Sequence, residues 1–218
     1  MTRNDRLVRV TAVGELPGAL DRLGVSRGRP VIVLVGGAGG MSARHLDLVR
    51  DLFGDLMPAL VRRGAAVVDG GTDTGVMQSI GEFSCDGVTL VGVAAEGSLG
   101  DTPLEPHHVH VLVPGESWGD ESPWIAEVAS VLAGPNAAVT LLVNGGDVTY
   151  VDAEQSIARR RPLIVLAGTG RTADVIASAA AGVVDDPRAA AIAAADLTQV
   201  VSVEDFVAVV AAELDRPG

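Results

Sequence analysis

Short apolar runs rich in β-branched residues alternate with helical patterns along most of this chain. Four of these runs, at residues 31–35, 65–69, 139–143 and 163–167, lead directly into glycine-rich loops, and a helical pattern follows each loop. A short apolar run is typical of a strand buried on both faces, and regular alternation with helices is typical of a parallel sheet. The pattern therefore predicts an α/β fold: a Rossmann-like, doubly wound, mostly parallel sheet with helices on both faces.

We interpret the whole chain, residues 1–218, as a single domain. Ser42 is expected to cap the first long helix, Pro58 to kink it and Gly64 to end it. Ser122 before Pro123 is expected to cap a later helix. The remaining predicted strands cover residues 7–13, 89–95, 110–113 and 200–201. The predicted helices cover residues 17–23, 42–63, 76–83, 122–134, 152–160, 172–180, a short segment after 186–187, and 202–214.

The glycine-rich loops form the candidate binding site. Strand carboxyl ends gather at one edge of a parallel sheet, where open α/β folds bind their ligands. Glycine lets the backbone approach a ligand closely, and a helix N-terminus presents unpaired N–H groups to an anion. Loop threonines either donate to phosphate or ribose, or cap the following helices. We therefore expect a phosphate-bearing ligand at Gly36, Gly37, Gly39, Gly71, Thr72, Thr74, Gly75, Gly145, Gly146, Thr149, Gly168 and Gly170.

Three charged side chains near these loops could take part in binding or catalysis. Arg171, at the mouth of the last helix of the set, could hold a phosphate bidentately; otherwise it is a surface arginine or pairs with Asp174. Asp152 follows the third loop and could serve as an acid or base. Carboxylates near the start of a helix, however, usually do no more than stabilise the helix by interacting with its dipole. Glu127 lies in an apolar helix and faces either solvent or the loops.

A cluster of histidines at His107, His108 and His110 raises the question of a metal site, since alternate residues share one face of a strand. No second group of metal ligands is evident in the sequence. Histidines at a strand entry are more often hydrogen-bonded polar groups, so we expect no metal here.

The composition excludes several functional classes. The net charge is −12, which argues against nucleic-acid or anionic-membrane partners. All 16 basic residues are arginine, so Walker A loops, Schiff-base enzymes and kinase-type lysines are excluded. Aromatic residues make up 3% of the chain, too few for a platform that stacks bases. The lone Cys85 and the absence of an apolar leader or a long apolar run predict a cytoplasmic protein.

Several motifs resemble those of the SLOG superfamily and, within it, the LSDAT branch. This branch includes the N-terminal cytoplasmic region of melastatin-type TRP channels and stand-alone bacterial proteins. GGTDTGVMQSIGE at 70–82 resembles the channel motif GG-x-NTGV, and GTGRTADVIA at 168–177 resembles D-G-S-G-R-A-S-D. His108-x-His110 resembles an NHxHF stretch, AEV at 126–128 matches a triplet, and LVNGG at 142–146 resembles a V-E-G-G loop. The resemblance covers about residues 7–180.

This resemblance implies a domain that binds a nucleotide-derived ligand such as ADP-ribose or another NAD metabolite. In some channel relatives an arginine of the G-x-GR piece contacts ADP-ribose, and that role would fall on Arg171 here. His108 and Glu127, which lie in matching motifs, become further possible binding residues. We expect a binding or sensor protein that requires no cofactor and, as is common in the superfamily, forms a homodimer.

Two alternative functions remain open. The superfamily also contains the LOG phosphoribohydrolase, which cleaves nucleoside monophosphates and carries the motif P-G-G-x-G-T-x-x-E. Residues 144–152 keep two glycines and the threonine of this motif, but Asp152 replaces the glutamate. A carboxylate that is one methylene shorter loses near-attack geometry, so a hydrolase that uses Asp152 or Glu127 is the second hypothesis. A non-catalytic oligomerisation module is the third.

Overall fold

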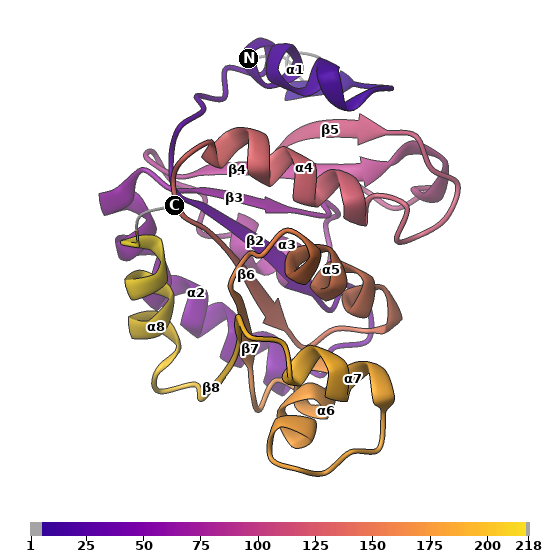
Figure 1. Cartoon of the computed structure of the whole chain (residues 1–218). Helices are drawn as coiled ribbons and strands as arrows, with labels where there is room; N and C mark the ends of the chain where they lie inside the picture. Colours follow the sequence, from indigo (N-terminus) through magenta and orange to yellow (C-terminus); the bar gives the residue numbers. More distant parts are fainter. Residues whose placement is uncertain (1–5, 217–218) are drawn as a thin grey trace.

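The computed structural model describes residues 6–216, which form one eight-stranded sheet in which every strand pair is parallel (Figure 1). The strand order is β1-β5-β4-β3-β2-β6-β7-β8. The predicted doubly wound α/β fold is confirmed. The strands are β1 (Leu7–Arg9), β2 (Val31–Gly36), β3 (Ala66–Asp69), β4 (Thr89–Ala95), β5 (Val109–Val113), β6 (Ala138–Val143), β7 (Leu163–Leu166) and β8 (Thr198–Val201).

Helices cover both faces of the sheet. On one face, α1 (Leu16–Arg22), α4 (Ser122–Ala133), α5 (Asp147–Ala158), α6 (Arg171–Ala180) and α7 (Pro187–Ala193) bury their apolar sides. On the other face lie α2 (Ala43–Arg63), α3 (Gly75–Gly81) and α8 (Phe206–Leu214). Short 3-10 turns occupy Val13–Glu15 and Glu96–Ser98.

The β2 strand shows how an unbroken apolar run serves two cores. Successive side chains of a strand point to opposite faces, so Val33 and Val35 pack under α4 and α5 while Ile32 and Leu34 pack against α2 and α3. All four side chains are buried. A polar residue at any of these positions would be buried without a partner, which is why the run contains none.

The connection order reverses between β2 and β6. From β2 the chain adds β3, β4 and β5 on one side, and then crosses back to add β6, β7 and β8 on the other. The loops after β2 and β6 therefore diverge to opposite faces and leave a crevice between them at the carboxyl ends. The sequence predicted the candidate site at the carboxyl edge, and the strand order locates this crevice within that edge.

Several predicted boundaries are wrong. The first strand, expected over 7–13, ends at Arg9, and Val13 already belongs to a 3-10 turn. The α5 helix begins at Asp147 and not at 152, because the Thr149 hydroxyl accepts a hydrogen bond from Gly146 N (3.1 Å) and closes the first turn. The N-cap of α4 is Glu121, and Ser122 is already helical. The last helix begins at Phe206, after a turn in which Asp205 N donates to the Ser202 hydroxyl.

The predicted start and end of the first long helix are confirmed. Ser42 accepts a hydrogen bond from His45 N, and Gly64 ends α2 in the left-handed conformation. Pro58 lies inside α2, which continues past it to Arg63. None of the helices described here has the length and apolar character needed to span a membrane.

Candidate functional site

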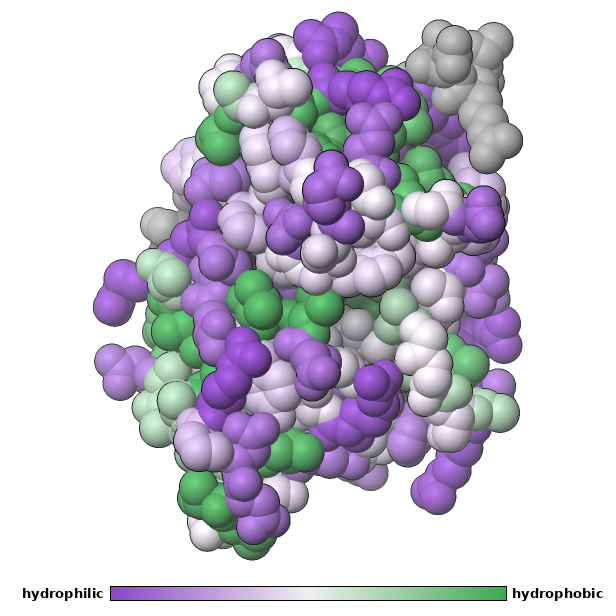
Figure 2. All heavy atoms as spheres, turned by 90° about the vertical axis from the view of Figure 1, so that its right-hand side faces the viewer, coloured by the Kyte–Doolittle hydropathy of each residue, from purple (hydrophilic) through white to green (hydrophobic). Residues whose placement is uncertain are grey.

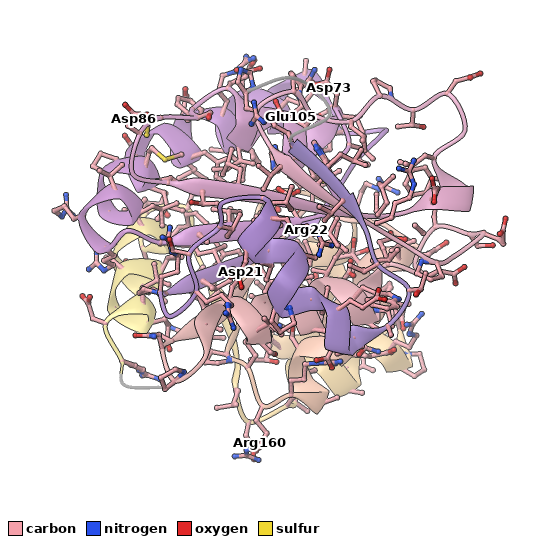
Figure 3. The ribbon with its side chains drawn as sticks, turned by 90° about the horizontal axis from the view of Figure 1, so that it is seen from above. Asp21, Arg22, Asp73, Asp86, Glu105 and Arg160 are labelled. Carbon is pink, nitrogen blue, oxygen red and sulfur yellow. The ribbon has the colours of Figure 1, made fainter. Side chains whose placement is uncertain are left out.

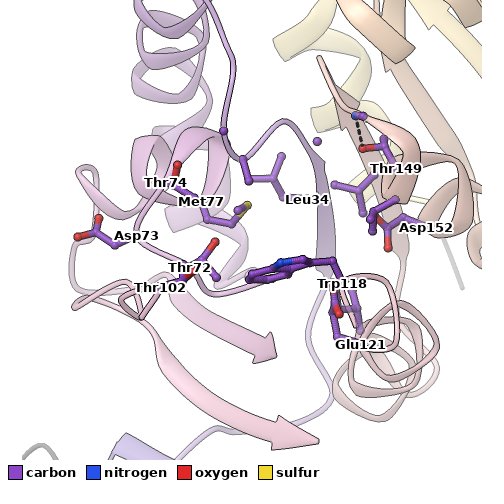
Figure 4. A pocket seen from close by; sticks show the side chains of 18 of the residues that line it. Leu34, Thr72, Asp73, Thr74, Met77, Thr102, Trp118, Glu121, Thr149 and Asp152 are labelled. Atoms are coloured by element: carbon purple, nitrogen blue, oxygen red, sulfur yellow. Dashed lines mark hydrogen bonds between the residues drawn. The ribbon is translucent and has the colours of Figure 1, made fainter. Parts of the chain in front are cut away.

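A cavity of about 730 Å³ opens where β2, β3 and β6 end. Hydrophilic and hydrophobic side chains are mixed over this face of the molecule (Figure 2). Inside the cavity, Thr72, Thr74 and Met77 lie on one side, and Glu121 and Asp152 lie on the other, with the Trp118 ring between them (Figure 4). The wall is completed by Leu34, Val35, Gly36, Ala38, Gly39, Gly70, Asp73, Asp101, Thr102, Pro103, Ile125, Gly146, Asp147, Val148, Thr149 and Arg171.

The structure brings part of the predicted set together. The segments that follow six of the strands, β2 to β7, all contribute to this cavity, as expected from the carboxyl-end rule. The predicted residues that line it are Gly36, Gly39, Thr72, Thr74, Gly146, Thr149, Asp152 and Arg171. The predicted residues that lie outside its lining are Gly37, Gly71, Gly75, Gly145, Gly168, Gly170, His108 and Glu127.

Gly75 supports the cavity by allowing two loops to pack closely against each other. It has a φ of +58°, and an added Cβ would collide with the backbone of Gly37 and Ala38. Val76 N also donates to Gly37 O (3.0 Å). The glycine therefore lets the start of α3 press against the loop after β2, so that both can face the same cavity.

Loop threonines divide between the two expected roles. The Thr149 hydroxyl caps α5 by accepting from Gly146 N. Thr74 is the N-cap residue of α3, but its side chain makes no capping hydrogen bond. Since Thr74 also lines the cavity, its hydroxyl is available to a ligand there.

Arg171 connects three of the loops. Its guanidinium donates to Gly39 O (3.1 Å) and lies over Gly146. Its backbone is left-handed, with a φ of +54°, a conformation that is uncommon outside glycine and is found where the surroundings enforce it. Asp174 does not pair with Arg171: its carboxylate accepts from Gly168 N (2.6 Å) and Gly170 N (3.0 Å). Arg171 is thus the cation at the mouth of the cavity.

Asp152 and Glu121 place two carboxyl groups in the cavity wall. Burial raises the pKa of Asp152 to about 7, the Ser122 hydroxyl acts in the opposite direction, and the Glu121 charge raises the pKa further. Burial also raises the pKa of Glu121, which is 7% exposed and accepts from Gly119 N (3.0 Å). Asp152 Oδ1 is buried and has no hydrogen-bond partner among the residues that the structure describes.

Glu121 and Trp118 were not predicted as site residues from the sequence. Both lie in the long segment between β5 and α4, which has no glycine motif of its own. The signal that could have found them is the helix start at Ser122–Pro123, because residues just before a helix that follows a parallel strand lie at the carboxyl edge. Trp118 is 50% exposed, which is high for a residue of its size.

Glu127 lies outside the cavity. Its carboxylate accepts from Arg159 (2.7 Å), and the two side chains join α4 to the end of α5. Its position on the helix, six residues after Glu121, carries it away from the carboxyl ends of the strands. The prediction that Glu127 acts as an acid in the site is therefore not supported by its position.

His108 is buried between two carboxylates. Its Nε2 lies 2.9 Å from Asp69 Oδ2 and its Nδ1 lies 2.5 Å from Glu105 Oε2. Burial alone would lower the pKa of His108, but the two carboxylates raise it to about 9. For Glu105, burial acts upward, and hydrogen bonds with His108 and His107 bring the pKa down to about 2. His108 is therefore a buried cation held by two anions, and both of its ring nitrogens are occupied.

This buried triad, defined as Asp69, Glu105 and His108, lies behind one wall of the cavity. Asp69 Oδ1 accepts from Gly71 N (2.8 Å), and Glu105 N donates to Gly71 O (2.9 Å). Asp73 N donates to Pro103 O (2.8 Å), so the segment that carries Glu105 runs alongside the loop after β3. Asp73 and Glu105 lie near each other at one edge of the molecule (Figure 3). The triad thus holds the loop after β3, which carries Thr72 and Thr74, and none of the three triad residues lines the cavity.

Three solved structures with similar folds match this chain over nearly their whole length. The molybdenum cofactor carrier protein from Chlamydomonas reinhardtii has a TM-score of 0.60 and 17% identity, covering 86% of this chain and 99% of its own. The molybdenum cofactor binding protein from the phototrophic bacterium Rippkaea orientalis has a TM-score of 0.58 and 14% identity, covering 86% and 98%. The structural-genomics target TM1055 has a TM-score of 0.56 and 21% identity, covering 84% and 98%.

The family assignment agrees with the fold and with the motifs at the carboxyl edge. No curated protein matches this chain significantly. A family model described as "SLOG in TRPM, prokaryote" matches residues 29–212, which include β2 to β8 and every loop of the cavity. The chain therefore belongs to the prokaryotic SLOG-in-TRPM family, the LSDAT branch of the SLOG superfamily.

Proposed function

We propose that this protein binds a phosphate-bearing, nucleotide-derived ligand, such as ADP-ribose or another NAD metabolite, in the cavity at the carboxyl edge. The observation that carries the proposal is the convergence of Arg171, Gly39 and the N-terminus of α5 at the mouth of the cavity. A guanidinium beside unpaired helix N–H groups is a favourable site for a phosphate.

The size and lining of the cavity support a small-molecule ligand. A volume of about 730 Å³ lies within the usual range for such pockets, roughly 300–1,000 Å³. Apolar side chains from β2, α3 and α4, among them Leu34, Met77 and Ile125, are joined by a few polar groups that can orient a ligand. Two proteins of similar fold are described as binding or carrying molybdenum cofactor, so this architecture is compatible with a bound small molecule.

A thermal-shift panel tests the proposal directly. It contains ADP-ribose, NAD, nicotinamide mononucleotide, AMP, ADP, ATP and inorganic phosphate at a fixed protein concentration. A ligand at 100 times its Kd stabilises the fold by about 2.7 kcal/mol, which raises the Tm by a few degrees at this chain length. The proposal predicts such a shift with at least one nucleotide, larger than that with phosphate. No shift with any nucleotide would contradict it.

Arg171→Ala is expected to weaken binding of the best ligand by about 1.5–3 kcal/mol, a factor of roughly 10 to 150, because a charged hydrogen bond to phosphate is lost. Isothermal titration calorimetry measures the change. The matched control is Arg160→Ala. Arg160 also has a left-handed backbone, with a φ of +53°, and its side chain points away from the rest of the molecule (Figure 3). Equal affinity in the two variants would remove Arg171 from the site.

Asp152 supports a second candidate function, the hydrolysis of a nucleoside monophosphate at its glycosidic bond. It stands where the LOG enzyme motif has glutamate, it lines the cavity, and a pKa of about 7 suits an acid or base at neutral pH. Release of free adenine from AMP, followed by chromatography, tests this function. A wild-type rate in Asp152→Ala would contradict the role of this residue.

A further inference from the structure

The charge of the cavity is unusual for a site that binds a nucleotide. Among the described residues that line it, one side chain, Arg171, is cationic. Five others carry carboxyl groups: Asp73, Asp101, Glu121, Asp147 and Asp152. A polyanion spread over the whole cavity would meet repulsion along most of its length. The ligand therefore needs an anionic group near Arg171 and a part of opposite character elsewhere.

Glu121 and Asp152 are the carboxyls that most need a partner. Glu121 is the N-cap residue of α4 and Asp152 lies in the second turn of α5, and neither forms an ion pair with a described basic residue. Asp152 Oδ1 is buried without a hydrogen-bond partner in the described part of the chain. Burial raises the pKa of both groups, in keeping with the absence of a cation beside them among the described residues.

Trp118 lies at the same end of the cavity as Glu121 and Asp152. Its ring extends between the two walls beside Glu121, and half of its surface is exposed (Figure 4). The indole face attracts cations more strongly than the faces of the other aromatic side chains do. A tryptophan face together with carboxylates is the chemistry that recognises a flat organic cation.

We propose that the Trp118–Glu121–Asp152 end of the cavity binds a positively charged aromatic ring, so that the ligand is a nucleotide with a cationic base, such as an N-ribosylated pyridinium. This inference rests on the proposed function and selects one class within it. It favours ligands that keep the pyridinium over ADP-ribose, which lacks that ring.

The layout of α5 fits such a ligand. Gly146 and Thr149 form the start of the helix beneath Arg171, where the phosphate would lie. Asp152 follows Asp147 by five residues, which corresponds to roughly 7.5 Å of helix rise away from that end. A ribose that joins phosphate to base spans a comparable length, so the ring would reach Trp118 and Glu121 while the phosphate stays at the mouth.

The test compares two forms of one compound. Oxidised nicotinamide mononucleotide carries the ring cation, and its 1,4-dihydro form keeps the phosphate, ribose and carboxamide but loses the charge. We expect the oxidised form to bind at least about tenfold more tightly by calorimetry. Equal affinities would overturn this inference and leave the proposed function standing, whereas failure of every nucleotide in the panel to bind would overturn both.

Substitutions test which residues cause the preference for the oxidised form over the dihydro form. Glu121→Gln should reduce the ratio between the two forms to about threefold or less. Trp118→Leu, at a half-exposed position, should also reduce it. Glu154→Gln is the matched control, since Glu154 lies on α5 but pairs with Arg188 at the surface (2.9 Å). A full ratio in both Glu121→Gln and Trp118→Leu would overturn the assignment of this end of the cavity.

Discussion

Replacement of His108 by alanine is expected to lower the free energy of unfolding by about 3–5 kcal/mol, the usual cost of removing one partner from a buried ion pair. The variant leaves Asp69 and Glu105 buried, with no cation between them. Urea denaturation at pH 7 measures the change. Because the triad anchors Gly71, the variant should also lose affinity for whichever ligand the cavity binds.

The matched control is His107→Ala. His107 contacts the same Glu105 (2.7 Å), but its side chain is half-exposed, so its loss should cost less than about 1 kcal/mol. Similar losses in the two variants would contradict the special role of the buried histidine.

The triad also sets a pH dependence. The pKa of His108 is raised from 6.5 to about 9, so its contribution to stability is complete below pH 6.5 and is lost as the pH rises through 9. The pKa of Glu105 is lowered from 4.5 to about 2, so its contribution is complete above pH 4.5 and is lost as the pH falls through 2. The alkaline loss should be absent from His108→Ala.

Asp152→Asn is expected to stabilise the protein above neutral pH, by up to about 4 kcal/mol at pH 8. The folded state raises the pKa of Asp152 from 3.8 to about 7, so it retains a proton that the unfolded chain releases, and stability falls as the pH rises from about 4 to 7. The asparagine variant has no such loss. Chemical denaturation at pH 4 and pH 8 should show little difference at the lower pH and a clear gain at the higher one.

Asp101→Asn serves as the control, because Asp101 lines the same cavity but is exposed. It should change stability little at either pH. A destabilised Asp152→Asn at pH 8 would contradict the inference that this carboxyl is buried at a cost. A stabilised variant that also binds its ligand less tightly would identify a residue retained for function at the expense of stability.

The four strands β2, β3, β6 and β7 could be predicted from the sequence because each is a short, buried apolar run that leads into a glycine-rich loop. The start of α5 could not, because Val148 and Val151 favour a strand and the helix depends on a hydrogen bond between Gly146 and Thr149. The sequence therefore predicted a loop up to residue 151 and a helix only from 152, five residues after its start in the structure.

The site itself was only partly predictable. Glycine loops identified the carboxyl edge, but their residues divide between the cavity wall and its support, a division that depends on packing between distant loops. The partners of His108 illustrate the limit. Asp69 lies 39 residues before it in the chain, and no local pattern connects the two. The sequence suggested a hydrogen-bonded histidine. The parallel pairing of β3, β4 and β5 brings Asp69 to it, whereas Glu105 lies three residues before it in the chain.

The reversal of strand order between β2 and β6 has a consequence for how the chain folds. Val31 pairs with Ala138, so the central contact of the sheet joins two segments from opposite halves of the sequence. Pairing at such long separation is slow, and β2 keeps one edge open during synthesis until β6 has left the ribosome. An open central edge invites pairing with other chains. Because the cavity forms across this junction, a ligand that fills it would bind only after the two halves have met, and would then make reopening of that edge rarer.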